Sequence, residues 1–152
     1  MSDPISFAST SPRLGLPLLF AGQAQKEVFV NEALSLLDGL LHGAVESETA
    51  TPPATPADGL AWLVGTSPTG SWAGKAGWIA LRQAGQWLFA EPRDGMKLLD
   101  RTTGQEFRRA GGAWHMATVP TPATGGTVID AEARAMLAAL VAALRQAGVF
   151  PL

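Results

Sequence analysis

The chain contains no cysteine, so the sequence excludes disulfide bonds, thiol catalysis and cysteine metal sites. Charged residues are also scarce, at 16% of the 152 residues, whereas 47% of the residues are apolar. A chain this hydrophobic is not disordered, and its few charges leave much of a monomer's surface uncovered. The composition therefore predicts a folded protein of ordinary domain length with a subunit interface.

Long hydrophobic runs are missing as well. The longest nearly apolar run is residues 135–144, whereas a membrane-spanning helix needs about 20 residues. The first residues lack the basic segment and apolar core of a signal peptide. We therefore expect a protein that is made in the cytoplasm, without a signal peptide and without insertion into a membrane.

The chain also lacks a large excess of either positive or negative charge. The formal net charge of −2 gives no general attraction to nucleic acid. Residues 59–117 alone carry seven basic and four acidic side chains, a net charge of +3. Solvated side chains explain such an excess, and we expect no nucleic-acid partner.

Catalytic motifs are absent too. His42 and His115 lack metal-ligand spacing, and the sequence has no HExxH, GxSxG or phosphate-loop motif. Paired carboxylates could cleave a glycan, but turn and strand-edge roles explain the candidates adequately; these are Glu91, Asp94, Asp100 and Glu106. We therefore expect no enzyme activity, no cofactor and no metal.

The most informative stretch is residues 22–41, GQAQKEVFVNEALSLLDGLL. A polar start leads into apolar residues spaced by three and four, which share one side of a helix. Asn31 could also cap a second helix if the chain breaks near Val30. The apolar stripe consists of Val30, Ala33, Leu34, Leu37, Leu40 and Leu41, and the polar candidates for assembly contacts are Gln23, Gln25, Lys26 and Asn31.

The combination of RLGLPLL, AGQAQKEV and NEALSLLDGLL in residues 13–41 resembles an uncharacterised domain family. That family occurs in bacteriophage tail-fibre and spike proteins and in the gene transfer agents of alphaproteobacteria. The resemblance covers about residues 12–117 and is most specific where GQAQKEV precedes NEAL. It implies a part of a phage-like particle rather than an enzyme.

Two proline-rich connectors, residues 49–59 and 118–126, organise the chain. They leave an N-terminal arm and helix in residues 1–48, a β-module rich in Gly and Trp in residues 59–117, and a helix in residues 127–152. Glycine-bearing turns separate short strand-like runs in the β-module, which predicts an antiparallel meander or a small barrel-like sheet within an α+β fold. The runs are residues 60–65, 77–82, 86–91, 96–101, 105–110 and 113–118.

All five tryptophans lie in the β-module. A tryptophan face can stack on a sugar ring, although a tryptophan more often contributes a large buried area to a core. Trp72 stands in a loop rich in Gly, Ser and Thr, so we expect it to be exposed and to be the best single candidate for polysaccharide binding. The other candidates are Trp78, Trp87, Arg82 and Gln86.

The third segment predicts a helix that starts at the cap residue Asp130 and ends before Gly148. We expect this helix to be apolar nearly all round and buried against copies of the same chain, although packing wholly within its own subunit is the alternative. The contact residues would be Met136, Leu137, Leu140, Val141 and Leu144.

The sequence thus predicts a non-enzymatic structural protein of a phage or gene-transfer-agent particle, such as a head spike, tail fibre or fibre adaptor. We expect a homo-oligomer, with a trimer favoured, that contacts other virion proteins and helps to attach the particle to host capsular polysaccharide or lipopolysaccharide. Such a protein would be made in the bacterial cytoplasm and then carried in the particle. The alternatives are a free carbohydrate-binding module and a polysaccharide-degrading enzyme.

Overall fold

The computed structural model describes residues 9–22, 24–122, 124–126 and 130–151. These residues form helices and short strands in an α+β fold, as predicted. The chain divides into two compact units, residues 1–92 and 93–152. Every one of the six predicted strand runs overlaps one of the observed strands.

The sheet of the first unit has the strand order β2-β3-β4-β5. β2 is parallel to β3, whereas β4 is antiparallel to both β3 and β5. Ala84 and Gly85 join β4 to β5, and their φ angles of 47° and 72° give the two-residue turn that suits a twisted hairpin. The strand bounds, including a short β1, are Ala44–Val45 (β1), Glu48–Thr49 (β2), Ala61–Val64 (β3), Ile79–Gln83 (β4) and Gln86–Ala90 (β5).

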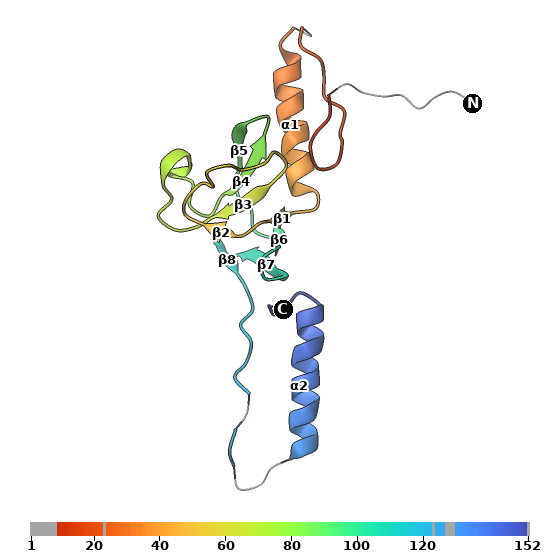
Figure 1. Cartoon of the computed structure of the whole chain (residues 1–152), viewed down its shortest axis with the longest axis vertical. Helices are drawn as coiled ribbons and strands as arrows, with labels where there is room; N and C mark the ends of the chain where they lie inside the picture. The colour runs from red at the N-terminus through yellow and green to blue at the C-terminus, as the bar shows by residue number, and fades with distance from the viewer. Residues whose placement is uncertain (1–8, 23, 123, 127–129, 152) are drawn as a thin grey trace, which may run out of the picture. The chain divides into compact units, whose positions relative to one another are not determined.

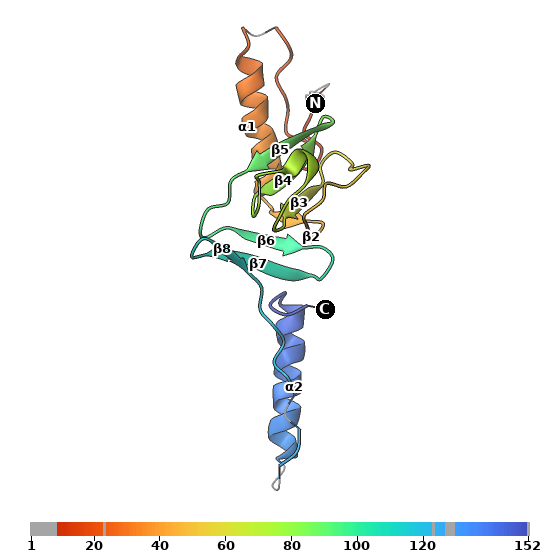
Figure 2. The same ribbon diagram turned by 90° about the vertical axis from the view of Figure 1, so that its left-hand side faces the viewer.

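Helix α1 (Lys26–Leu40) precedes the strands of the first unit. It is continuous through Asn31, so the alternative of a helix break near Val30 is not realised. Residues 9–19 form an arm that folds back on itself, with a bridge between Thr10 and Pro17, and the arm runs beside α1 (Figures 1 and 2).

The two faces of the first sheet are packed by different elements. Leu81 of β4 lies directly beneath Gly39 of α1, so this face is packed against the helix. The opposite face carries Trp62 and Ala80, which are buried with Trp72 from the 3-10 turn Gly70–Trp72. The loop between β3 and β4 therefore packs against the face of the sheet that α1 leaves open.

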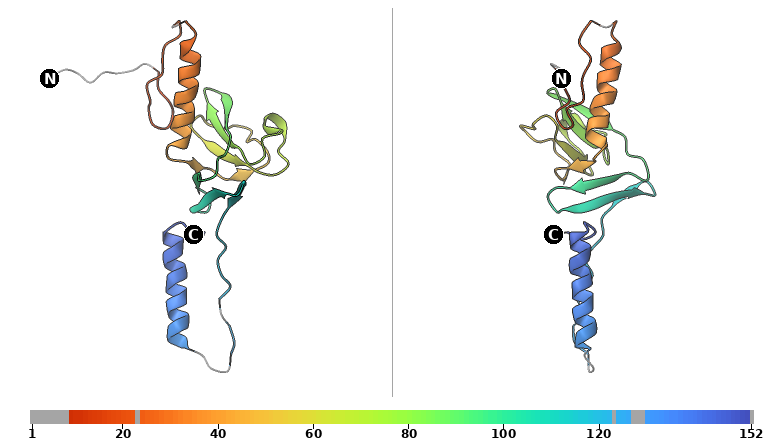
Figure 3. Two further views of the ribbon diagram at one scale, coloured as in Figure 1. Left: turned by 180° about the vertical axis from the view of Figure 1, so that it is seen from behind. Right: turned by 90° about the vertical axis from the view of Figure 1, so that its right-hand side faces the viewer.

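The described part of the second unit contains three antiparallel strands and helix α2 (Ala131–Gln146). The residues after α2 are fixed to β7, because Gln105 Nε2 donates to Val149 O at 2.8 Å and Glu106 N donates to Gly148 O at 2.9 Å. Figure 3 shows α2 with the segment that follows β8 running alongside it. The strands are Lys97–Asp100 (β6), Gln105–Ala110 (β7) and Ala113–His115 (β8).

Helix α2 confirms its predicted start but not its predicted character. The Asp130 side chain accepts a hydrogen bond from Ala133 N at 2.8 Å, so it caps the helix as expected. The expectation that the helix is apolar nearly all round is wrong, whereas its burial against copies of the same chain stays a prediction. Charged residues lie in its first and last turns, among them Glu132 and Arg145, and none of its residues is buried. The described residues of the second unit therefore leave α2 largely uncovered.

Among the described residues, neither helix combines the length and the apolar character that crossing a lipid bilayer requires.

Candidate functional site

Helix α1 is attached to its own chain through a polar side. Asp38 is 4% exposed and accepts three hydrogen bonds from the arm. The donors are Ser11 Oγ at 2.7 Å, Arg13 N at 3.0 Å and Leu14 N at 2.6 Å. A buried carboxylate is stable only with such partners, so Asp38 fixes the position of the arm on α1.

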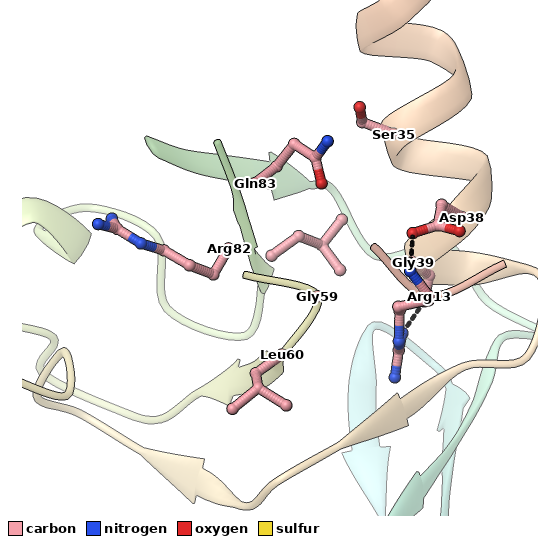
Figure 4. Close-up of a pocket in the computed structure, with 9 residues that line it drawn as sticks. Arg13, Ser35, Asp38, Gly39, Gly59, Leu60, Arg82 and Gln83 are labelled. Carbon is pink, nitrogen blue, oxygen red and sulfur yellow. Dashed lines mark hydrogen bonds between the residues drawn. The ribbon is translucent and has the colours of Figure 1, made fainter. Parts of the chain in front are cut away.

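Two further polar side chains strengthen this attachment. Asn31 Oδ1 accepts from Leu19 N at 2.8 Å and Asn31 Nδ2 donates to Leu19 O at 3.0 Å, so the amide pairs with one backbone unit as a strand would. Arg13 donates to Gly39 O at 2.8 Å and to Ala44 O at 3.0 Å. Arg13 thereby links the arm, the end of α1 and β1, and Figure 4 shows it beside Asp38 and Gly39.

Because the polar side faces inward, four of the six residues of the apolar stripe of α1 are left exposed, and the other two, Leu34 and Leu40, are half-buried. Val30 is 41% exposed, Leu37 47% and Leu41 57%, and Ala33 is exposed as well. An amphipathic helix in a globular protein normally turns such a stripe toward the core. In the single chain, the fully buried residues of α1 are instead Ser35, Asp38 and Gly39.

The four polar assembly candidates separate into different roles. Gln23 lies outside the described residues. Gln25 and Lys26 are exposed, and Gln25 has a left-handed φ of 64° without a side-chain cap on the helix. Asn31 contacts its own arm, so its amide already has a partner within the chain.

Helix α2 carries a second exposed apolar surface. Met136 is 62% exposed, Leu137 51% and Leu140 49%, whereas Val141 and Leu144 are half-buried. Leu137, Leu140 and Leu144 follow one another at spacings of three and four, which is the repeat of a helix that packs against other helices.

The expectation that Trp72 is exposed is wrong. Trp72 is completely buried, and its ring lies 6.4 Å from that of Trp62 and 5.0 Å from that of Trp87. The glycines of the loop allow the chain to turn back at Gly70, where φ is 58°, so that the ring inserts over the sheet. Trp72 therefore has no free face for a sugar.

Three aromatic residues near this cluster remain half-buried, namely Trp78, Trp87 and Phe89. Lys75 Nζ lies 3.7 Å from the centre of the Trp78 ring and 5.5 Å from that of Phe89. Arg82 Cζ lies 5.1 Å from the centre of the Trp87 ring. We call Lys75, Trp78, Arg82, Trp87 and Phe89 the cationic aromatic surface.

The cationic aromatic surface contains three of the five residues proposed for ligand binding. Gln86 is not part of it, because neighbouring residues of a strand point to opposite faces and Trp87 occupies this one. Figure 4 shows the same alternation in β4, where Arg82 points away from α1 and Gln83 points toward it. Sequence reasoning missed Lys75 and Phe89; alternation along β5 could have found Phe89, whereas Lys75 is placed by an irregular loop.

A small hollow lies between α1 and the sheet, lined by residues that include Arg13, Asp38 and Gln83 (Figure 4). Its free space is about that of a single water molecule. The polar groups of Arg13 and Asp38 that reach it already bond to the arm and to α1. We assign this hollow to the attachment of the arm.

The acidic residues considered for glycan cleavage have structural partners. Asp100 accepts from Thr102 N at 2.8 Å, and Asp94 accepts from Gly112 N at 3.1 Å. Glu106 forms an ion pair with Lys97 at 2.9 Å. Within the part of the chain that the structure describes, no group of three or more His, Cys, Asp or Glu residues could hold a metal ion.

The sequence from residue 30 to residue 115 matches the family described as "Protein of unknown function (DUF2793)". The chain belongs to this family. The match covers more than half of the chain and confirms the uncharacterised domain family expected from residues 13–41. A search of curated proteins finds no match. The DUF2793 match begins inside α1 and ends at His115, so it includes the whole cationic aromatic surface.

Proposed function

We propose that the protein is a non-enzymatic structural component of a phage or gene-transfer-agent particle, as a head spike, tail fibre or fibre adaptor. It self-associates, with a trimer favoured, and helps to attach the particle to host cell-surface polysaccharide. The resemblance of residues 13–41 to domains of tail-fibre and spike proteins supports the particle role. The observation that carries self-association is the exposure of apolar stripes on both helices.

The exposed stripes favour assembly because α1 buries polar residues while it leaves apolar residues exposed. In α1 the buried positions are Ser35, Asp38 and Gly39, whereas Val30 and Leu37 stay at the surface. Full burial of one large apolar side chain stabilises by about 1.5–3 kcal/mol. Each half-exposed leucine would therefore gain about 1 kcal/mol in an interface, and this gain is repeated in every copy of the chain.

Attachment to a glycan fits the same arrangement, because weak sites gain from repetition. An oligomer that presents several copies of one site can raise avidity by about 10²–10⁴ over a single site. The cationic aromatic surface lies in the first unit, whereas α2 lies in the second.

The test of self-association is light scattering on the full chain at micromolar concentration. We expect the unmodified protein to be an oligomer, and the double substitution Leu137→Glu with Leu140→Glu to dissociate it, because buried charges at these positions would be unpaired. Ala142→Glu is the matched control, since Ala142 is exposed and lies off the stripe. The unmodified protein running as a monomer would reject the assembly proposal.

The particle role is tested separately. Mass spectrometry of purified particles from a strain that carries this gene should detect the protein in fixed stoichiometry with capsid or tail proteins. Its absence from the particles, with normal amounts in the cell, would leave the free carbohydrate-binding module as the better explanation.

A further inference from the structure

Both cations of the cationic aromatic surface lie against aromatic rings, and Arg82 alone also has a carboxylate, that of Asp58, within 4.0 Å. Among the described residues, Lys75 forms no ion pair, and its ammonium is held by the rings of Trp78 and Phe89. We propose that this surface binds a carboxylated polysaccharide, through the acidic groups of uronate-type sugars, in preference to a neutral one. This inference rests on the proposed attachment function and specifies its ligand class.

The geometry disfavours simple stacking of a neutral sugar. An ammonium 3.7 Å from the centre of Trp78 occupies the ring face that a sugar ring would need. Trp87 is flanked by Arg82 and meets the rings of Trp62 and Trp72 edge-on at 5.7 and 5.0 Å. The groups left to meet a ligand are therefore the cations, and the rings hold them in place.

A cation over an aromatic ring keeps its full charge, because the ring attracts it without neutralising it. Lys75 and the guanidinium of Arg82 are half-buried, so part of their hydration is already lost before a ligand binds. A carboxylate would meet preorganised donors, and a guanidinium can bond both of its oxygens.

The carboxylate of Asp58 only partly offsets the positive charge of Arg82. Asp58 Oδ1 lies 4.0 Å from Arg82 Nε and also accepts a hydrogen bond from Gly85 N at 3.0 Å. Arg82 Nε itself is buried without a hydrogen-bond partner. Lys75 is thus the less compensated of the two cations, and we expect its removal to have the larger effect on an acidic ligand.

The experiment measures binding of the full-length protein to immobilised polygalacturonate and to the same polymer after its carboxyl groups are reduced to alcohols. We expect about tenfold or more tighter binding to the acidic polymer, with a strong decrease at high salt. Lys75→Gln should lower the affinity for polygalacturonate about tenfold and leave binding to the reduced polymer unchanged. Lys97→Gln is the matched control, because Lys97 is exposed and paired with Glu106, and it should behave as the unmodified protein.

Three outcomes would overturn the inference. The first is equal binding to both polymers, and the second is an unchanged affinity for polygalacturonate after Lys75→Gln. The third is Lys75-dependent binding of single-stranded DNA of matched charge that is as tight as the binding of polygalacturonate, because it would indicate general attraction to polyanions. Tryptophan fluorescence confirms that each variant is folded, and Arg82→Gln provides a second substitution. If both polymers bind equally and Lys75→Gln has no effect, glycan attachment still stands and only the acidic preference fails. If no polysaccharide binds, the attachment function fails with it.

Discussion

The replacement Asp38→Ala tests whether the arm determines which side of α1 faces inward. The carboxylate accepts two backbone hydrogen bonds, from Arg13 and Leu14, and one from the Ser11 hydroxyl. A buried donor that loses its partner costs about 1–3 kcal/mol. The cost summed over the three donors is an upper limit, because the arm can detach and water can then bond to the released donors. We therefore expect a loss of about 3 kcal/mol, expressed mainly as local opening of residues 9–19.

Two measurements resolve this effect. Hydrogen exchange should become much faster in the arm, at Ser11, Arg13 and Leu14, and urea unfolding followed by tryptophan fluorescence should give the change in the free energy of unfolding. Asp94→Ala is the control, because that side chain is 56% exposed and accepts from a single backbone donor, Gly112 N. It should cost less than about 1 kcal/mol. Equal effects of the two substitutions, or unchanged exchange in the arm of Asp38→Ala, would refute the reasoning.

Two further substitutions test local packing and capping. Gly39→Ala would place a Cβ 3.2 Å from Leu81 Cγ and still closer to its methyl groups. Overpacking costs about 1–3 kcal/mol, whereas the higher helix propensity of alanine stabilises by about 1 kcal/mol. Urea unfolding should therefore show a modest loss in the free energy of unfolding, which Leu81→Val partly restores. Asp130→Ala should cost about 1 kcal/mol of helix stability, seen as lower far-ultraviolet helicity at raised temperature, whereas Asp130→Ser should retain most of it; equal helicity of both variants would argue against the cap.

The strands and helix ends could be predicted from local chemistry. Glycine-bearing turns delimit the strands because positive φ angles are needed there, as at Gly85 and Gly95. Asp130 and Gly148 mark the two ends of α2 for equally local reasons, a side-chain acceptor and a left-handed residue. Each of these features depends on residues that are close together in the sequence, so the sequence alone was enough to find them.

The surfaces were harder to predict because they depend on contacts between distant residues. Trp72 looked exposed because its neighbours are small and polar, yet the same glycines let the loop fold over the sheet and bury the ring. Lys75 carried no sequence signal, since only the path of that loop brings it over Trp78. In both cases an irregular loop, and not a periodic pattern, decides where the side chain lies.

Helix α1 shows why an apolar stripe does not by itself identify the inward side of a helix. Asp38 and Asn31 find hydrogen-bond partners in an arm that the sequence places 12–27 residues earlier, and Gly39 permits close approach to Leu81. These contacts need specific geometry, whereas the stripe needs only an apolar neighbour. The polar side is therefore the one that a single chain must satisfy internally, because unpaired buried groups are costly. The exposed apolar residues need no partner of fixed geometry within the chain, and this asymmetry is the physical basis of the proposal that α1 contacts another subunit.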